Sequence, residues 1–238
     1  MAIIHNTTMS PTKLDLLAGW LPAQPWYRPA GHEPELARMG GFRLDDPDGA
    51  VGIEFMVVTD GSGSGVVTYQ IPLTYRAGAL AGADGALIGT SEHGVLGRRW
   101  IYDGVHDPVL RTQLVALIQG DAEAQAQTVS DTKDPTVISQ PAVKGSLTPL
   151  WSAVAANGPD GTDLRVGTTA AEDGHTGELI VRISRVLQGS DGVSGNDVSG
   201  DGVSGNDDAG PPCLSATWHL PDGTRARGVF ATARYTQA

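Results

Sequence analysis

The sequence predicts an α+β fold in which a mostly antiparallel, curved sheet is covered by few helices. Glycine (32 residues) and proline (15 residues) are frequent in the 238-residue chain, and both residue types favour short elements joined by turns. Several runs are apolar or alternate between apolar and polar residues, as strands do. One well-capped helical pattern follows the first group of these runs, and strands followed by a helix that covers them are α+β organisation.

The first predicted element is a short helix over residues 13–21. Three leucines fall at helical spacing, and Ser10 or Thr12 can cap the first turn. The proline-rich stretch that follows is unsuited to a helix or a central strand. We expect its aromatic residues, Trp26 and Tyr27, to fold back against the helix.

Residues 51–59 and 66–76 predict an antiparallel hairpin. Both runs are rich in β-branched and aromatic residues, and a glycine- and serine-rich turn joins them. Pro72 cannot donate a backbone hydrogen bond, so the second strand should bulge or lie at an edge there. Residues 86–90 and 95–102 predict two further short strands.

The best helical pattern in the chain begins after Asp107. Asp107 is a good N-cap, Pro108 suits the first helical position, and a stripe of leucine and isoleucine follows. Gly120 can end this helix, although residues 121–127 contain enough alanine and glutamine to continue it.

The composition turns polar at residues 129–133, which predicts a boundary between a first domain, 1–128, and a strand-rich second half, 129–238, packed on it. Within the second half, residues 188–211 contain a near-duplicated acidic repeat of glycine, serine and aspartate. Such a composition cannot bury a core, so we predict a disordered loop. Because glycine- and aspartate-rich calcium repeats are loosely similar, calcium binding by Asp191 to Asp208 stays an open alternative.

The charge and the cysteine content exclude several classes of function. Sixteen basic and 27 acidic residues give a net charge of −11, which repels phosphate backbones and anionic lipid, so we expect no nucleic-acid and no membrane partner. The single cysteine, Cys213, excludes an intramolecular disulfide and favours a cytoplasmic location. The first residues do not form a secretory signal, and no apolar run reaches the ~20 residues that span a bilayer.

Residues 88–117 hold the densest group of chemically reactive side chains. The candidate ligand or partner contacts in this stretch are Glu92, His93, Arg98, Arg99, Trp100, Asp103 and His106. Their chemistry would suit a metal or an acid–base site, but the spacing matches no ligand pattern such as His-Glu-x-x-His. We therefore predict no metal ligand, no cofactor and no catalytic residue, and we expect the histidines to pin loops by hydrogen bonds. Trp26 and Tyr27 are also candidate ligand or partner contacts, because aromatic rings can stack on sugars, although such rings more often lie in a core.

Three segments resemble the N-terminal cap region of maltokinases. Residues 20–27 (Trp-Leu-Pro-Ala-Gln-Pro-Trp-Tyr) are similar to the opening motif of that family, with Pro25 in place of an arginine. Residues 67–73 resemble its Tyr-x-Val-Pro-Leu strand, and residues 96–118 resemble its Tyr-Asp element and the helix that follows. The resemblance covers roughly residues 13–127. It implies a cystatin-like cap, which in the family precedes a kinase region that phosphorylates maltose with ATP and magnesium.

The chain departs from a complete kinase of this family. It contains no His-Gly-Asp-type catalytic loop and no Asp-Phe-Gly-like metal-binding motif, and Arg182 falls where the ATP-binding lysine would lie. The resemblance therefore implies a stand-alone, non-catalytic binding or regulatory protein of glycan and trehalose (maltose-1-phosphate) metabolism, with a carbohydrate-active or kinase partner. Proteins of this kind are sometimes labelled 1,4-α-glucan branching proteins, but a branching enzyme needs a barrel for which this chain is too short.

One alternative stays open at this point. The chain could be a small enzyme or a sugar-binding protein that uses Glu92, His93, Arg98, Asp103 and His106.

Overall fold

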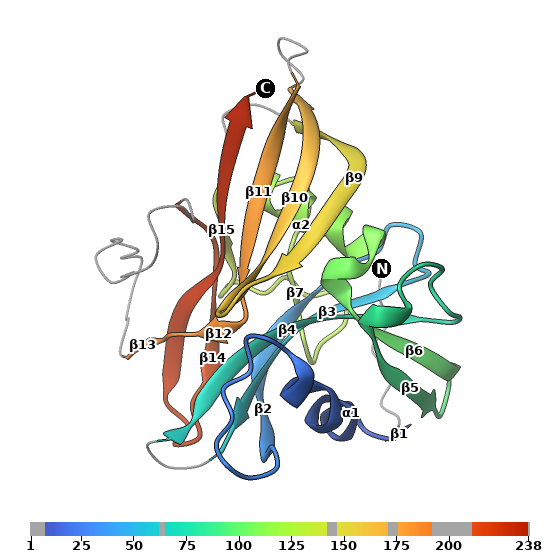
Figure 1. The fold of residues 1–238 in the computed structure, drawn as a ribbon, viewed down its shortest axis with the longest axis vertical. Helices are drawn as coiled ribbons and strands as arrows, with labels where there is room; N and C mark the ends of the chain where they lie inside the picture. Colours follow the sequence, from blue (N-terminus) through green and yellow to red (C-terminus); the bar gives the residue numbers. More distant parts are fainter. Residues whose placement is uncertain (1–7, 62–64, 142–146, 171–175, 192–210, 238) are drawn as a thin grey trace.

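The computed structural model describes residues 8–61, 65–141, 147–170, 176–191 and 211–237 (Figure 1). The α-helices are α1 (Lys13–Trp20) and α2 (Pro108–Gln119), and the short 3₁₀ helices are η1 (Leu21–Ala23), η3 (Asp84–Ala86) and η4 (Gly104–His106). The strands of the first half are β1 (Met9–Ser10), β2 (Leu36–Leu44), β3 (Gly52–Asp60), β4 (Val67–Arg76), β5 (Leu87–His93), β6 (Gly97–Asp103) and β7 (Gln125–Ala126). The strands of the second half are β8 (Ile138–Ser139), β9 (Leu147–Asn157), β10 (Gly161–Ala170), β11 (Thr176–Ser184), β12 (Val186–Leu187), β13 (Ser190–Asp191), β14 (Pro212–His219) and β15 (Arg225–Gln237).

These strands join into one antiparallel sheet of 15 strands, whose main path runs β1-β5-β6-β4-β3-β2-β14-β15-β11-β10-β9. The predicted fold class, a cystatin-like α+β cap with a helix-covered sheet, is therefore wrong. The two α-helices of the described chain span 8 and 12 residues, which is too short to cover such a sheet.

Two features explain the error. The sheets of the two halves meet where Trp218 of β14 pairs with Gly40 of β2, and no local pattern predicts a contact between residues so far apart. The second helix also ends at Gly120, whose left-handed backbone (φ 85°) is favourable for glycine. Residues 125–126 then add a short strand to β2 instead of continuing the helix.

The two helices pack on opposite faces of the β3–β4 region. Leu17 of α1 lies in one buried cluster with Met56 and Val58 of β3, whereas Phe55 and Val57 face a larger cluster that contains α2. This alternation is the period of two that a strand imposes on its side chains. In Figure 1, α1 lies beside the strands of the first half and α2 lies behind the long strands of the second half.

Several local predictions are confirmed. The side chain of Thr12 accepts a hydrogen bond from the backbone of Asp15 and caps α1, and β3 pairs with β4 as the predicted hairpin. Pro72 lies in β4 without a register shift against β3. On its other side, β12 reaches only Tyr69 and β6 begins only at Leu73, so Pro72 lies at a local edge as expected.

The two halves share one core. The larger buried cluster takes residues from β2, β3 and α2 and also from β10, β11, β14 and β15. The division into domains 1–128 and 129–238 stays a prediction. The predicted acidic loop and its calcium alternative fall largely on residues 192–210, which lie outside the described residues.

Candidate functional site

The candidate stretch is divided between two places in the fold. Glu92, His93, Arg98 and Arg99 lie at the exposed end of the β5–β6 hairpin, whereas Asp103 lies buried at the other end of β6. A strand of seven residues rises ~3.3 Å per residue, so the two ends of β6 lie about 20 Å apart. The sequence neighbours therefore do not form one site.

At the hairpin, the polar side chains bind one another or the turn. Glu92 and Arg98 form an ion pair of 2.7 Å between two largely exposed side chains, an arrangement that contributes little to stability. The His93 Nδ1 atom accepts hydrogen bonds from the backbone N–H groups of Val95 (3.3 Å) and Leu96 (3.0 Å). Arg99 donates to the Leu96 carbonyl at 2.8 Å. His93 thus stabilises the turn of the β5–β6 hairpin by hydrogen bonds, as the sequence predicts.

At the buried end, Asp103 meets a residue that sequence reasoning missed. The Nη2 atom of Arg185 lies 2.8 and 2.7 Å from the two carboxylate oxygens of Asp103, and both side chains are almost fully buried. The Arg185 Nε atom donates to Thr162 Oγ1 at 2.8 Å. The guanidinium also stands 5.1 Å from the centroid of the Trp26 ring, a cation–π contact. We call Trp26, Asp103, Thr162 and Arg185 the junction cluster, because it joins the two halves of the chain.

The junction cluster brings together two of the predicted site residues, Asp103 and Trp26, through a third that was not predicted. Arg182, which falls at the position of a kinase lysine in the resemblance, instead pairs with Asp163 at 3.2 Å on the outer face of the sheet. A signal for Arg185 is its place at the end of a continuous strand pattern. The pattern alone cannot show that β11 stops at Ser184 and turns the next side chain inward.

His106 lies near the junction cluster, in η4 after Asp103, and is half-buried. Burial lowers the pKa of His106 below its ordinary value. The negative charge of Asp103 opposes this shift, and the positive charges of Arg111 and Arg185 add to it. The ring is therefore neutral near pH 7. A general acid or base must come within hydrogen-bond reach of a substrate proton. The neighbouring carboxylate, Asp103, is already bound to Arg185.

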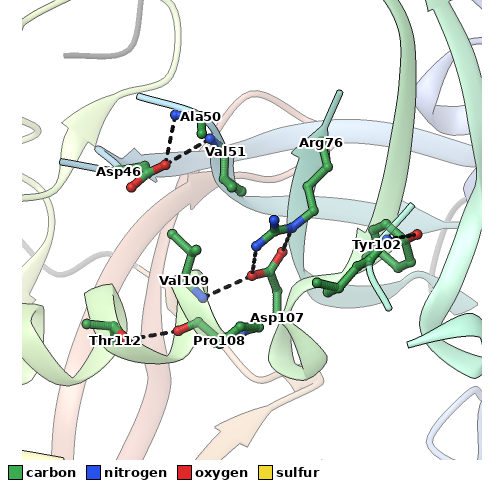
Figure 2. A network of polar contacts seen from close by, with 10 residues as sticks. Asp46, Ala50, Val51, Arg76, Tyr102, Asp107, Pro108, Val109 and Thr112 are labelled. Atoms are coloured by element: carbon green, nitrogen blue, oxygen red, sulfur yellow. Dashed lines mark hydrogen bonds and ion pairs between the residues drawn. The ribbon is translucent and has the colours of Figure 1, made fainter. Parts of the chain in front are cut away.

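Asp107 has a structural role (Figure 2). Its carboxylate accepts from the backbone N–H of Val109 at 2.9 Å and so caps α2 as predicted. The same carboxylate binds Arg76 through two bonds, Nε to Oδ2 at 2.6 Å and Nη2 to Oδ1 at 2.7 Å. These hydrogen bonds raise the pKa of Arg76. Nearby, Asp46 accepts from the backbone N–H groups of Ala50 and Val51, both at 2.9 Å.

Of the candidate aromatic residues, Trp26 lies in the core, and Tyr27 and Trp100 are partly buried against it or a smaller cluster. Trp26 is fully buried and packs edge-on against Trp20 at 5.7 Å between centroids. Tyr27 stacks on Tyr69 at 5.8 Å and donates to Asp60 at 2.9 Å. Burial and the Asp60 carboxylate together raise the pKa of Tyr27 to about 12. Trp100 is half-buried against a small cluster around Tyr102. The rings therefore do not form an open platform for a sugar.

A further buried carboxylate, Glu54 of β3, was not predicted as a site residue. It accepts from Lys13 Nζ and from the Tyr75 hydroxyl, each at 2.5 Å, and from Gln127 Nε2 at 2.7 Å. Burial raises the pKa of Glu54, but the charge of Lys13 and the hydrogen bonds of Lys13 and Tyr75 outweigh it and lower the pKa. Burial and the Glu54 charge raise the pKa of Tyr75 well above its usual value. A lone acid within an apolar strand is the signal that could have indicated this cluster.

Two kinds of feature are absent from the described part of the chain. No group of three or more histidine, cysteine, aspartate or glutamate side chains is placed there to hold a metal ion. Among the same residues, no helix has the length and apolar character that crossing a bilayer requires.

Part of the chain matches a known protein family. Residues 20–107 match the family model of the maltokinase N-terminal cap domain, so the resemblance predicted from the sequence is confirmed over this segment. The matched segment runs from the end of α1 to the N-cap of α2 and includes Trp26 and Asp103 of the junction cluster. Arg185 and Thr162 lie outside it. No curated protein matches the chain significantly.

Proposed function

We propose that this chain, in which residues 20–107 match the maltokinase N-terminal cap domain, is a non-catalytic binding or regulatory protein associated with maltokinase. The family match supports the link to maltokinase and, through it, to trehalose and maltose-1-phosphate metabolism. On this proposal the protein acts by docking onto a carbohydrate-active or kinase partner.

The observation that carries the proposal is how the reactive side chains of the candidate stretch are used. Asp103 is bound to Arg185, Asp107 is bound to Arg76 and to the start of α2, and Glu92 is bound to Arg98. A general acid or base must instead reach a proton of the substrate. Asp103 and Asp107 therefore act as parts of the framework, and Glu92 is held in an exposed ion pair, an arrangement that suits a non-catalytic binding module.

The alternative of a small enzyme or a sugar-binding protein rests on His106. Its ring is half-buried and kept neutral, and no described residue donates to it or accepts from it through a hydrogen bond. A neutral imidazole can donate to or accept from a sugar hydroxyl. This reading predicts that His106→Ala abolishes maltose binding in calorimetry while the melting temperature stays nearly unchanged.

The experiment that tests the proposal is capture of partners by the tagged full-length chain from a native lysate, followed by identification by mass spectrometry. We expect a maltokinase or another carbohydrate-active enzyme, and we expect the purified chain to change the maltose phosphorylation rate of that enzyme. The purified chain alone, given maltose, ATP and magnesium, should form no maltose 1-phosphate. Capture without any carbohydrate-active or kinase partner, or turnover by the chain alone, would refute the proposal.

A further inference from the structure

Two cations, Lys13 and Arg38, act on the buried carboxylate of Glu54. Lys13 of α1 donates to Glu54 at 2.5 Å, and its ammonium nitrogen lies 4.8 Å from the centroid of the Tyr75 ring. Burial raises the pKa of Glu54, whereas the charge and hydrogen bond of Lys13, the hydrogen bond of Tyr75 and the charge of Arg38 lower it. Both cations therefore lie within electrostatic range of one carboxylate.

The strand register places Arg38 of β2 on the same face of the sheet as Glu54 of β3. Arg38 is the register partner of Val58, and Val58 packs in the cluster that contains Leu17 of α1. Register partners share a face of the sheet. Glu54 lies on that face too, since it bonds Lys13 of α1. Val58 and Glu54 are four residues apart on β3, so their rows lie about 13 Å from each other.

Between these two rows, β2 contributes only a glycine to the α1 face. Gly41 is the register partner of Met56, which packs in the same cluster as α1. A side chain at Gly41 would come within 3.0 Å of the Gln127 amide nitrogen, and the positive φ of 124° also favours glycine. The bare backbone leaves room for the Gln127 amide, which donates to Glu54 at 2.7 Å. It also lets the long side chain of Arg38 extend toward Glu54.

The hydrogen-bond donors of this group outnumber its acceptors. The Glu54 carboxylate already accepts from Lys13, Tyr75 and Gln127. Lys13 has three N–H donors and Arg38 has five, and Arg38 forms no hydrogen bond or ion pair with a described residue. Arg38 is exposed and the Lys13 side chain is 28% exposed, so a ligand from solvent can reach both. The group therefore presents unused donors and positive charge without a matching acceptor.

We infer that Lys13, Arg38 and Gln127 form a binding site for the phosphate group of a small molecule. Arginine binds phosphate through its planar fork of donors, and lysine binds it as a point charge. Glu54 offsets one of the two positive charges, and a phosphate group would offset the other and supply the acceptors that the donors lack. A neutral sugar fits less well, because its hydroxyl groups offset no charge. The inference goes beyond the proposed function and does not depend on a protein partner.

The test is isothermal titration calorimetry of the full-length chain with inorganic phosphate, glucose 1-phosphate and glucose. The ionic strength is held constant, because salt screens exposed charges. We expect both phosphates to bind with a dissociation constant of about 1 mM or lower, and glucose to bind more weakly than glucose 1-phosphate. Equal affinities for the two phosphates would identify free phosphate as a sufficient ligand. A higher affinity for glucose 1-phosphate would identify a phosphate ester.

The variant Arg38→Gln should lower the affinity for phosphate about tenfold, because it removes charge-assisted hydrogen bonds. Its melting temperature without phosphate should stay nearly unchanged, since Arg38 is exposed. The matched control is Arg225→Gln at the start of β15. Arg225 is also exposed and forms no hydrogen bond or ion pair with a described residue. The control removes the same charge and should leave the affinity within a factor of about two.

A thermal-shift series gives a second readout. Phosphate that binds the folded chain raises its melting temperature, and this rise should shrink in Arg38→Gln but not in Arg225→Gln. Binding that is unchanged in Arg38→Gln, or lost equally in both variants, would overturn the inference. Glucose that binds as tightly as glucose 1-phosphate, or no binding of either phosphate, would overturn it too. None of these results bears on capture of a carbohydrate-active partner, so the proposed function is tested separately.

Discussion

The buried ion pair between Arg185 and Asp103 should be the most sensitive point of the fold. Arg185 is fully buried and Asp103 is 2% exposed, so removal of either charge leaves the other without a counter-ion in a poorly solvated interior. We predict that Arg185→Met lowers the free energy of unfolding by about 3–5 kcal/mol. Small domains are stable by only about 5–15 kcal/mol, so this loss is a large part of the total.

The structure allows the contribution of each contact of Arg185 to be separated. Thr162→Val removes the acceptor of the Arg185 Nε–H group together with the hydroxyl that donates to Asn157 Oδ1 at 2.6 Å, and it leaves the Asp103 pair in place. This change should cost about 1–3 kcal/mol. The double variant Arg185→Met/Asp103→Leu removes both charges, and it should regain much of the stability that Arg185→Met alone loses, because no unpaired charge is left. The single variants Arg185→Met and Asp103→Leu and their double variant form a thermodynamic cycle. Its coupling free energy measures the interaction of Arg185 with Asp103.

Urea unfolding followed by tryptophan fluorescence supplies the measurement, with the midpoint and the slope fitted for each variant. The exposed pair provides the control, since Glu92→Gln should cost less than about 1 kcal/mol. If Arg185→Met lowers the free energy of unfolding no more than Glu92→Gln does, loss of the counter-ion of Asp103 does not destabilise the fold. The prediction for this ion pair would then be refuted. A double variant as unstable as the worse single variant would likewise contradict it.

Three further predictions concern other parts of the structure. Because the pKa of His106 lies below its ordinary value of 6.5 in the folded state, its contribution to stability is present above about pH 6.5 and is lost as the pH falls. His106→Gln should therefore flatten the acid side of a plot of unfolding free energy against pH. Gln119 binds the backbone N–H and carbonyl of Leu147 at the start of edge strand β9, so Gln119→Ala should lower the melting temperature by a few degrees and speed aggregation measured by light scattering. Tyr75→Phe removes one of three donors to Glu54 and should cost about 1–3 kcal/mol in urea unfolding, with a larger effect implying that the other two donors depend on it.

The elements that could be predicted from the sequence depend on short-range patterns. The Asp107 cap of α2 and the β3–β4 hairpin follow from residues within a few positions of one another, and the structure contains both. The end of α2 was left open because alanine and glutamine after Gly120 favour a helix. The backbone there turns left-handed, and residues 125–126 pair with β2. A tertiary pairing overrides the weak local propensity in that segment.

The division of the candidate stretch between two places has a related reason. Reactive side chains close in sequence suggested a common site, but successive strand residues point to opposite faces and the strand carries its two ends apart. Asp103 found its partner 82 positions away in Arg185, a distance at which a single sequence gives no pairing signal. Arg182 was singled out because the resemblance places it at the position of a kinase lysine, whereas the alternation of β11 places it on the outer face beside Asp163.

The junction cluster also bears on how the cap-like segment is held. Asp103 and Trp26 belong to the segment that matches the maltokinase cap, while Arg185 and Thr162 belong to the part of the chain that does not. The buried charge of Asp103 is therefore neutralised by a residue from outside the matched segment. Separation of the two parts would expose Trp26 and leave Asp103 unpaired, at a cost that a small fragment cannot offset. It follows that the cap-like segment of this protein depends on the second half for its stability.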